Sequence, residues 1–172
     1  MIIDAHAHLW KKQQGKVNGK DVFPVGDGKS NFGGVIRQMM PPYMNDDENT
    51  AERFIANMNY AGVSGAVITQ EEIDGNQDAY LLEAKAKYPD RLKICSLYED
   101  GKAYTFDGFD GIKICGGRLT KVKLEELSPL FHKAEDFYDS YDNLFIMELF
   151  HGPTLAFKDV ALTLLPYFLS VL

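Results

Sequence analysis

Short apolar runs alternate with amphipathic segments along most of the chain. The apolar runs predict strands: residues 1–5 are the start of the first, and the others lie at 66–69, 92–97, 111–114 and 144–149. Between them, apolar residues recur at helical spacing and predict helices over 50–61, 77–88 and 124–137, followed by an apolar, helical tail over 158–172. Strands that alternate with helices are typical of a parallel α/β sheet or barrel.

The first predicted helix carries signals at both ends. Asn49 or Thr50 can cap its N-terminus, because either side chain offers an oxygen to the first free backbone N–H groups. Gly62 suits the left-handed position just after the helix. Residues 11–49, in contrast, are rich in Gly, Pro, Asn, Asp and Lys without a clear period, and they predict a long loop or insertion.

The length of the chain limits how much of a barrel it can form. A complete eightfold barrel takes about 250 residues, whereas this chain has 172. We therefore predict an α/β fold, a partial (β/α) barrel of the TIM type with about five parallel strands and helices outside. Such a sheet has open edges, which favour pairing with a second copy, so a homo-oligomer is expected.

Composition excludes several classes of partner. The net charge of -7 argues against nucleic acid or an anionic membrane surface as a partner. No apolar run reaches the roughly 18 residues of a membrane span, and the N-terminus lacks a signal-peptide pattern. Cys95 and Cys115 are the only cysteines, which argues against a disulfide framework and favours a cytoplasmic protein.

A His-x-His motif closes the first predicted strand. Residues two apart in a strand point to the same side, so His6 and His8 project together. Two imidazoles on one face can bind a single divalent metal, zinc above all. The motif is short, and an equally open interpretation has one histidine capping a loop and the other in solvent.

The surrounding sequence resembles the amidohydrolase superfamily, in its amidohydrolase-related, decarboxylase-like branch, over about residues 1–135. The stretches that carry the resemblance are IDAHAHLW at 3–10, NMNYAGVSGAV at 57–67, YLLEA at 80–84, YPDR at 88–91 and GFDGIKI at 108–114. The resemblance implies a (β/α)₈ barrel with one or two divalent metals acting on a small carbonyl substrate. It assigns metal-ligand roles to His6 and His8. It also leaves Lys113, at the end of a strand, either a carbamylated or charged site lysine or a solvated one.

That family's later strands and their ligands have no counterpart in this sequence. A catalytic metal needs about three protein ligands, and two histidines leave the set incomplete. His151 follows the strand predicted at 144–149, so we consider it as a third ligand.

A second resemblance covers residues 143–170. The stretch NLFIMELFHGPTLAFKD at 143–159 is similar to the threonine synthase signature, which implies that Lys158 forms a Schiff base with pyridoxal phosphate. The chain ends before the Gly-rich loop that would bind the cofactor's phosphate. In this view His151 only repeats the signature and binds nothing.

The sequence thus predicts a chimera. Residues 1–135 form the amidohydrolase-like part, 136–142 a junction, and 143–172 a threonine-synthase-like strand and helix packed on the same domain. The favoured function is a truncated metal-dependent hydrolase. The alternatives are a fragment of a pyridoxal-phosphate lyase and a non-catalytic α/β domain that self-associates.

Overall fold

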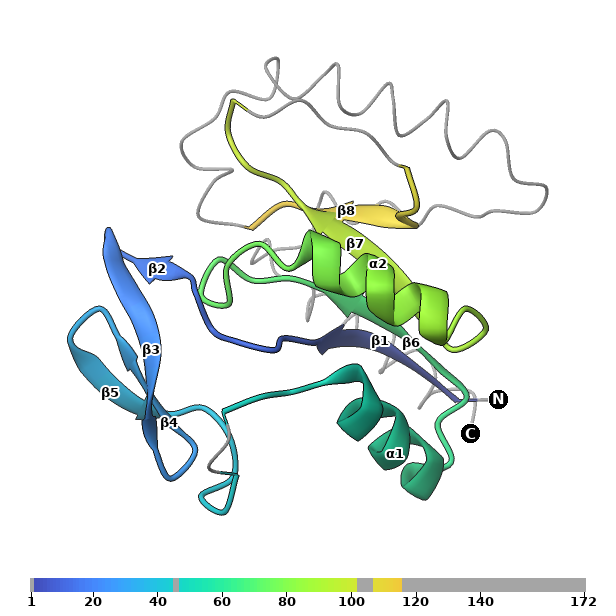
Figure 1. Ribbon diagram of the computed structural model, residues 1–172, viewed down its shortest axis with the longest axis horizontal. Coiled ribbons are helices and arrows are strands. Elements are labelled where there is room, and N and C mark those ends of the chain that lie inside the picture. Colours follow the sequence, from blue (N-terminus) through green and yellow to red (C-terminus); the bar gives the residue numbers. More distant parts are fainter. Residues whose placement is uncertain (1, 45–46, 102–106, 116–172) are drawn as a thin grey trace, which may run out of the picture. The chain divides into compact units, whose positions relative to one another are not determined.

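A computed structural model describes residues 2–44, 47–101 and 107–115, all within the first of the chain's two units, Met1–Glu135. These residues form two four-stranded sheets and two helices (Figure 1). The predicted strand at 144–149, the predicted helix at 124–137 and the apolar tail lie outside the described residues.

The larger sheet is parallel and built from the predicted strands. Its members are β1 (Ile3–His8), β6 (Gly65–Thr69), β7 (Leu92–Leu97) and β8 (Gly111–Lys113), side by side in that order. The pairs β1–β6, β6–β7 and β7–β8 are all parallel. The four strands therefore lie in the sheet in the same order as they occur along the chain, as the alternating pattern predicts.

Two helices connect these strands, close to the predicted bounds. Helix α1 (Ala51–Ala61) begins after Thr50, whose side chain accepts a hydrogen bond from the Arg53 backbone N–H at 3.4 Å. It ends at Gly62, whose φ of 70° is the left-handed conformation that glycine adopts without strain. Helix α2 (Asp78–Lys87) ends before Tyr88, which is followed by Pro89.

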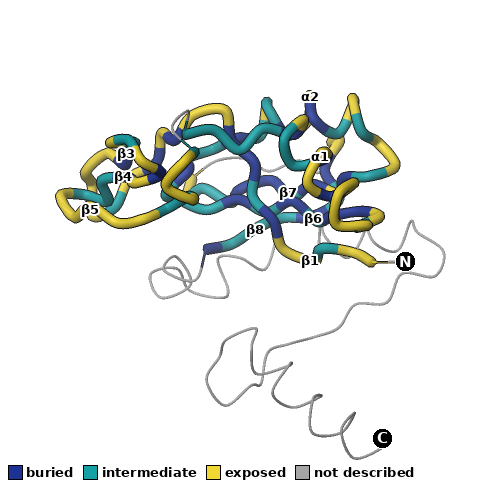
Figure 2. Tube along the Cα trace, turned by 90° about the horizontal axis from the view of Figure 1, so that it is seen from below, coloured by how far each residue is buried: buried dark blue, intermediate teal, exposed yellow. Residues whose placement is uncertain are grey.

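Both helices lie on the same face of the parallel sheet (Figure 2). An apolar core fills the space between them and contains Ile55 and Met58 from α1, Leu81 from α2, and Ile68 and Ile94 from the strands. Four strands in sequential order with helices on one face have the winding of a partial (β/α) barrel. The described residues form an open sheet of this kind, and closure into a barrel is not part of it.

The prediction of a long loop over residues 11–49 is wrong. This stretch contains β2 (Lys16–Val17), β3 (Lys20–Gly26), β4 (Lys29–Phe32) and β5 (Val35–Gln38), which form a second, antiparallel sheet in that order. We call it the β2–β5 sheet. Val22 is the one apolar side chain of these four strands that is buried, so they need no regular alternation of apolar and polar residues.

Turn chemistry, not hydrophobic period, specifies the β2–β5 sheet. Its three hairpins have two-residue connections: Asn18-Gly19, Asp27-Gly28 and Gly33-Gly34, all with positive φ. Turns with two positive φ values match the right-handed twist of paired strands, and Asn-Gly and Asp-Gly are their preferred sequences. These dipeptides were the signal that could have predicted the hairpins.

Among the described residues, no helix is long and apolar enough to cross a membrane.

Candidate metal centre

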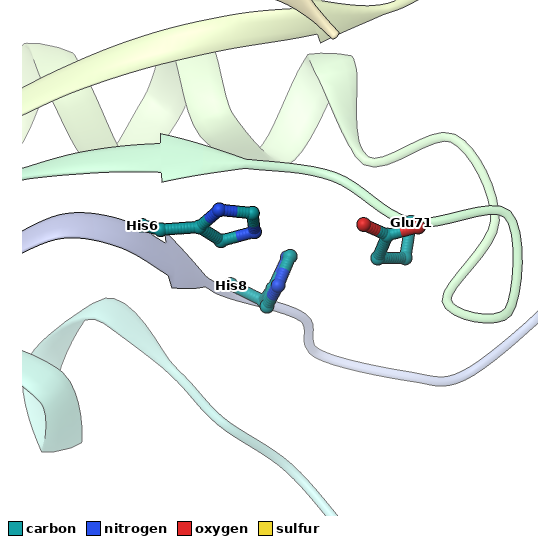
Figure 3. A group of neighbouring side chains, drawn as sticks. All are labelled: His6, His8 and Glu71. Atoms are coloured by element: carbon teal, nitrogen blue, oxygen red, sulfur yellow. The ribbon is translucent and has the colours of Figure 1, made fainter. Parts of the chain in front are cut away.

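The two histidines of the His-x-His motif project from the end of β1, as predicted. Their ring centroids lie 4.9 Å apart in an edge-to-face arrangement. Figure 3 shows both rings extending toward the connection that follows β6. They lie at the C-terminal end of a parallel strand, where the active sites of (β/α) barrels are found.

A third group, Glu71, comes from that connection. One ligand atom each of His6, His8 and Glu71 lies within 4.8 Å of the other two. In Figure 3 the Glu71 carboxylate faces the two imidazoles. The site therefore joins the ends of two neighbouring strands, β1 and β6, which pair in register through His8 and Thr69.

The orientation of His8 is fixed by the strand beside it. Its Nδ1 lies 3.3 Å from the carbonyl oxygen and 3.5 Å from the hydroxyl of Thr69, and in the tautomer with the proton on Nδ1 the ring donates to that carbonyl. The other ring nitrogen, Nε2, then keeps its lone pair. This is the arrangement in which protein histidines bind metals, with the second nitrogen donating to a carbonyl or carboxylate.

Electrostatics favour the neutral ring that a metal requires. Burial lowers the pKa of His8, and the neighbouring His6 lowers it further, against the opposing effects of Glu71 and the Thr69 carbonyl. A neutral imidazole at neutral pH is ready to bind a cation without first losing a proton.

Glu71 is held by two residues from the end of β8. The Lys113 ammonium lies 2.6 Å from its Oε1, and the Cys115 thiol donates to its Oε2 at 3.5 Å. Burial raises the pKa of Glu71, but the hydrogen bond and charge of Lys113 outweigh it, so the net pKa is below its ordinary value. The Lys113 side chain is 19% exposed and pairs with Glu71, so it is not simply solvated, while its role in a metal site stays a prediction.

This donor set fits a divalent metal. Two neutral imidazoles and one carboxylate are a known catalytic zinc set, with the fourth position left for water or substrate. Ligands about 2.1 Å from a tetrahedral metal lie about 3.4 Å from one another. In the structure these atoms lie up to 4.8 Å apart, so the three side chains would move closer together to bind one ion.

The remaining predicted site residues, His151 and Lys158, lie outside the described residues. Their roles as third metal ligand and as pyridoxal phosphate anchor stay predictions. Glu71 was not predicted, although it follows directly on the strand predicted at 66–69. A polar Gln-Glu-Glu run at the carboxyl end of a parallel strand is the signal that pointed to it.

A polar pocket of about 580 Å³ opens beside the connection that carries Glu71. It is lined by residues from 14–19 and 72–76, together with Leu97 and Glu99. Two of these segments follow β1 and β6, and Leu97 ends β7, so the pocket is at the same carboxyl end of the sheet as the histidine and glutamate cluster. Most of its lining is polar, including Lys16, Glu72 and Asn76.

Comparison with known proteins gives one structural likeness. No family model matches the chain, and no curated protein matches it. The fold is similar to the crystal structure of a probable 2-pyrone-4,6-dicarboxylic acid hydrolase from Acinetobacter baumannii with citric acid bound, with a TM-score of 0.53 and 21% identity.

The likeness covers 78% of this chain and 46% of that enzyme, so the chain spans about half the neighbour's length. At this identity it shows the fold alone, a partial α/β arrangement that the chain shares with that hydrolase. The resemblance of residues 143–170 to threonine synthase gains no support from these comparisons.

Proposed function

We propose that this chain carries the metal centre of an amidohydrolase-type hydrolase, in which His6, His8 and Glu71 hold one divalent ion, zinc above all. The observation that supports this most is the meeting of two imidazoles and a carboxylate at the ends of adjacent parallel strands. The reaction class is hydrolysis or decarboxylation of a small carbonyl substrate. A second copy paired at the open sheet edges is part of the same proposal.

Each residue has a defined task in this proposal. A divalent ion held there would supply Lewis acidity toward the substrate's carbonyl oxygen. His8 presents Nε2 in the tautomer whose Nδ1 proton is donated to the Thr69 carbonyl. Lys113 keeps the Glu71 carboxylate ionised and in place through its 2.6 Å ion pair.

The polar pocket is the proposed substrate site. Glu72 and Glu99 are acidic and Lys16 is the one cation among the residues that line it. Lys16 also lies 3.6 Å from the carboxylate of Asp21, which offsets its charge. This lining favours a polar, neutral or cationic small molecule over a polyanion.

The test is metal stoichiometry and affinity of the purified full chain, measured by elemental analysis and by Zn²⁺ titration. Trp10 is the chain's only tryptophan and lies two residues from His8, so its fluorescence provides a local readout. We expect about one metal per chain, lost in the His6→Ala/His8→Ala double variant. Glu71→Gln is expected to weaken binding about 10-fold or more, because the charged ligand is replaced by a neutral one.

Glu83→Gln is the matched control, since Glu83 is an exposed glutamate that pairs with Lys11 on the surface. It should leave the affinity unchanged. A wild-type chain that binds no metal would contradict the proposal. Full affinity in Glu71→Gln together with its loss in His151→Ala would replace Glu71 by His151 as the third ligand.

A further inference from the structure

A chain of buried polar side chains joins the β2–β5 sheet to the connection that carries Glu71. Ser30 on β4 donates to Oε1 of Gln13 at 2.6 Å, and Nε2 of Gln13 donates to Oδ1 of Asp74 at 3.3 Å. The exposed fractions of the three residues are 2%, 4% and 3%. The backbone N–H of Asp74 donates to the Glu71 carbonyl at 3.0 Å and so closes the turn on which Glu71 lies.

The backbone repeats this link. The N–H groups of Gln14 and Lys16 donate to the carbonyls of Asp74 and Glu72, at 3.2 and 3.3 Å. Between them, Gly15 packs so closely that a Cβ there would overlap the backbone of Glu72 and Ile73. The carbonyl of Gly15 in turn accepts from the β3 backbone, at the N–H of Val22. The segment 13–16 is therefore fixed between β3 and the Glu71 connection.

Buried polar chains of this kind contribute little net stability compared with apolar packing of equal volume. What they do supply is geometric specificity, because each donor and acceptor is satisfied in one arrangement only. The Glu71 connection between β6 and α2 has no regular secondary structure to hold it. Its position depends on such side-chain and backbone bonds.

We propose that Ser30, Gln13 and Asp74 are positioning residues for the metal centre, and that the β2–β5 sheet holds Glu71 in reach of His6 and His8. This rests on the proposed function, since it assumes that the three residues bind a metal. Outer hydrogen bonds of this type commonly change metal affinity 10–100-fold when they are removed.

The test compares Zn²⁺ affinity in four full-length variants at a temperature where circular dichroism shows each one folded. Ser30→Ala removes the first hydrogen bond, and Gln13→Met removes both at similar volume. We expect each to weaken Zn²⁺ binding about 10-fold or more, and Ser30→Thr, which restores a hydroxyl, to recover most of the loss. Thr50→Ala is the control, because it removes the α1 cap at a cost of about 1 kcal/mol and Thr50 is not part of this link.

The outcomes separate the two proposals. The inference is supported if the wild-type chain binds Zn²⁺, if Ser30→Ala and Gln13→Met bind it more weakly, and if the affinity of Thr50→Ala is unchanged. If Ser30→Ala and Gln13→Met both bind Zn²⁺ as tightly as the wild-type chain, the positioning role is overturned while the proposed metal centre is kept. Equal losses in Thr50→Ala and Ser30→Ala would also overturn it, since the effect would then follow stability alone. A wild-type chain without metal affinity would remove the basis of both.

Discussion

The two sheets of this protein are stabilised in different ways. The parallel sheet buries Ile68, Ile94 and Leu81 completely between strands and helices. The β2–β5 sheet buries one apolar side chain, Val22, and instead buries Ser30 in a hydrogen bond. Apolar burial is non-directional and supplies most of the folding free energy, whereas hydrogen bonds specify position.

The parallel sheet therefore provides most of the stability, and the β2–β5 sheet provides geometry. The apolar side chains of the β2–β5 sheet that are exposed include Phe23, Val25 and Ile36, so this sheet gains little from excluding water. Its turns specify its shape, and its buried polar groups specify where the Glu71 connection lies. The candidate metal ligands lie at the ends of β1 and β6 in the parallel region.

The largest expected effect is a matched pair of isoleucine substitutions. Ile94→Ala, at a residue that is 0% exposed in the parallel sheet, is expected to lower the unfolding free energy by about 2–5 kcal/mol. Ile36→Ala on β5, where 58% of the residue is exposed, should change it by less than about 0.5 kcal/mol. Urea denaturation of both variants measures this. Equal losses of unfolding free energy would contradict this difference, because burial of apolar side chains would then stabilise the β2–β5 sheet as well.

A glycine pair tests the link between the regions. Gly15→Ala should lower the unfolding free energy by about 1–3 kcal/mol and weaken Zn²⁺ binding, since the added methyl group pushes against the Glu71 connection. Gly19→Ala meets no atoms but must adopt a φ of 77°, which costs about 1 kcal/mol without moving the connection. Thermal melts and Zn²⁺ titration of each variant measure both quantities. Unchanged Zn²⁺ affinity in Gly15→Ala would show that the connection keeps its place without this contact.

The smallest effect on stability at neutral pH concerns the thiol on β7. Burial, helped by the charge of Asp110, raises the pKa of Cys95 from 9.0 to about 11. At pH 8 the thiolate fraction is therefore about 100-fold lower in the folded than in the unfolded chain, and alkylation of Cys95 should slow accordingly. Because the unfolded thiol ionises first, folding stability should fall as pH rises from 9 to 11.

Alkylation rates of the two cysteines, resolved by mass spectrometry with and without denaturant, measure this. Cys95 is partly exposed, so rapid labelling of it in the native chain would contradict the raised pKa of this thiol.

The sequence predicted the parallel region closely because its signals are local. Apolar runs and helical spacing located β1, β6, β7, β8 and both helices, and Thr50 and Gly62 marked the ends of α1. Two-residue spacing also placed His6 and His8 on one side of a strand. The β2–β5 sheet was missed because its strands lack an apolar period, although its turn dipeptides were visible.

By itself, the sequence determined the βαβ winding and the paired histidines, because each depends on residues a few positions apart. The third residue of the candidate metal centre was identified from the tertiary structure alone. Glu71 comes from another strand end and reaches the histidines through parallel pairing of β1 with β6. Its ion pair with Lys113 and its link to Ser30 join residues far apart in the chain. Such contacts leave no period in the sequence, since long-range pairing and not local conformation creates them.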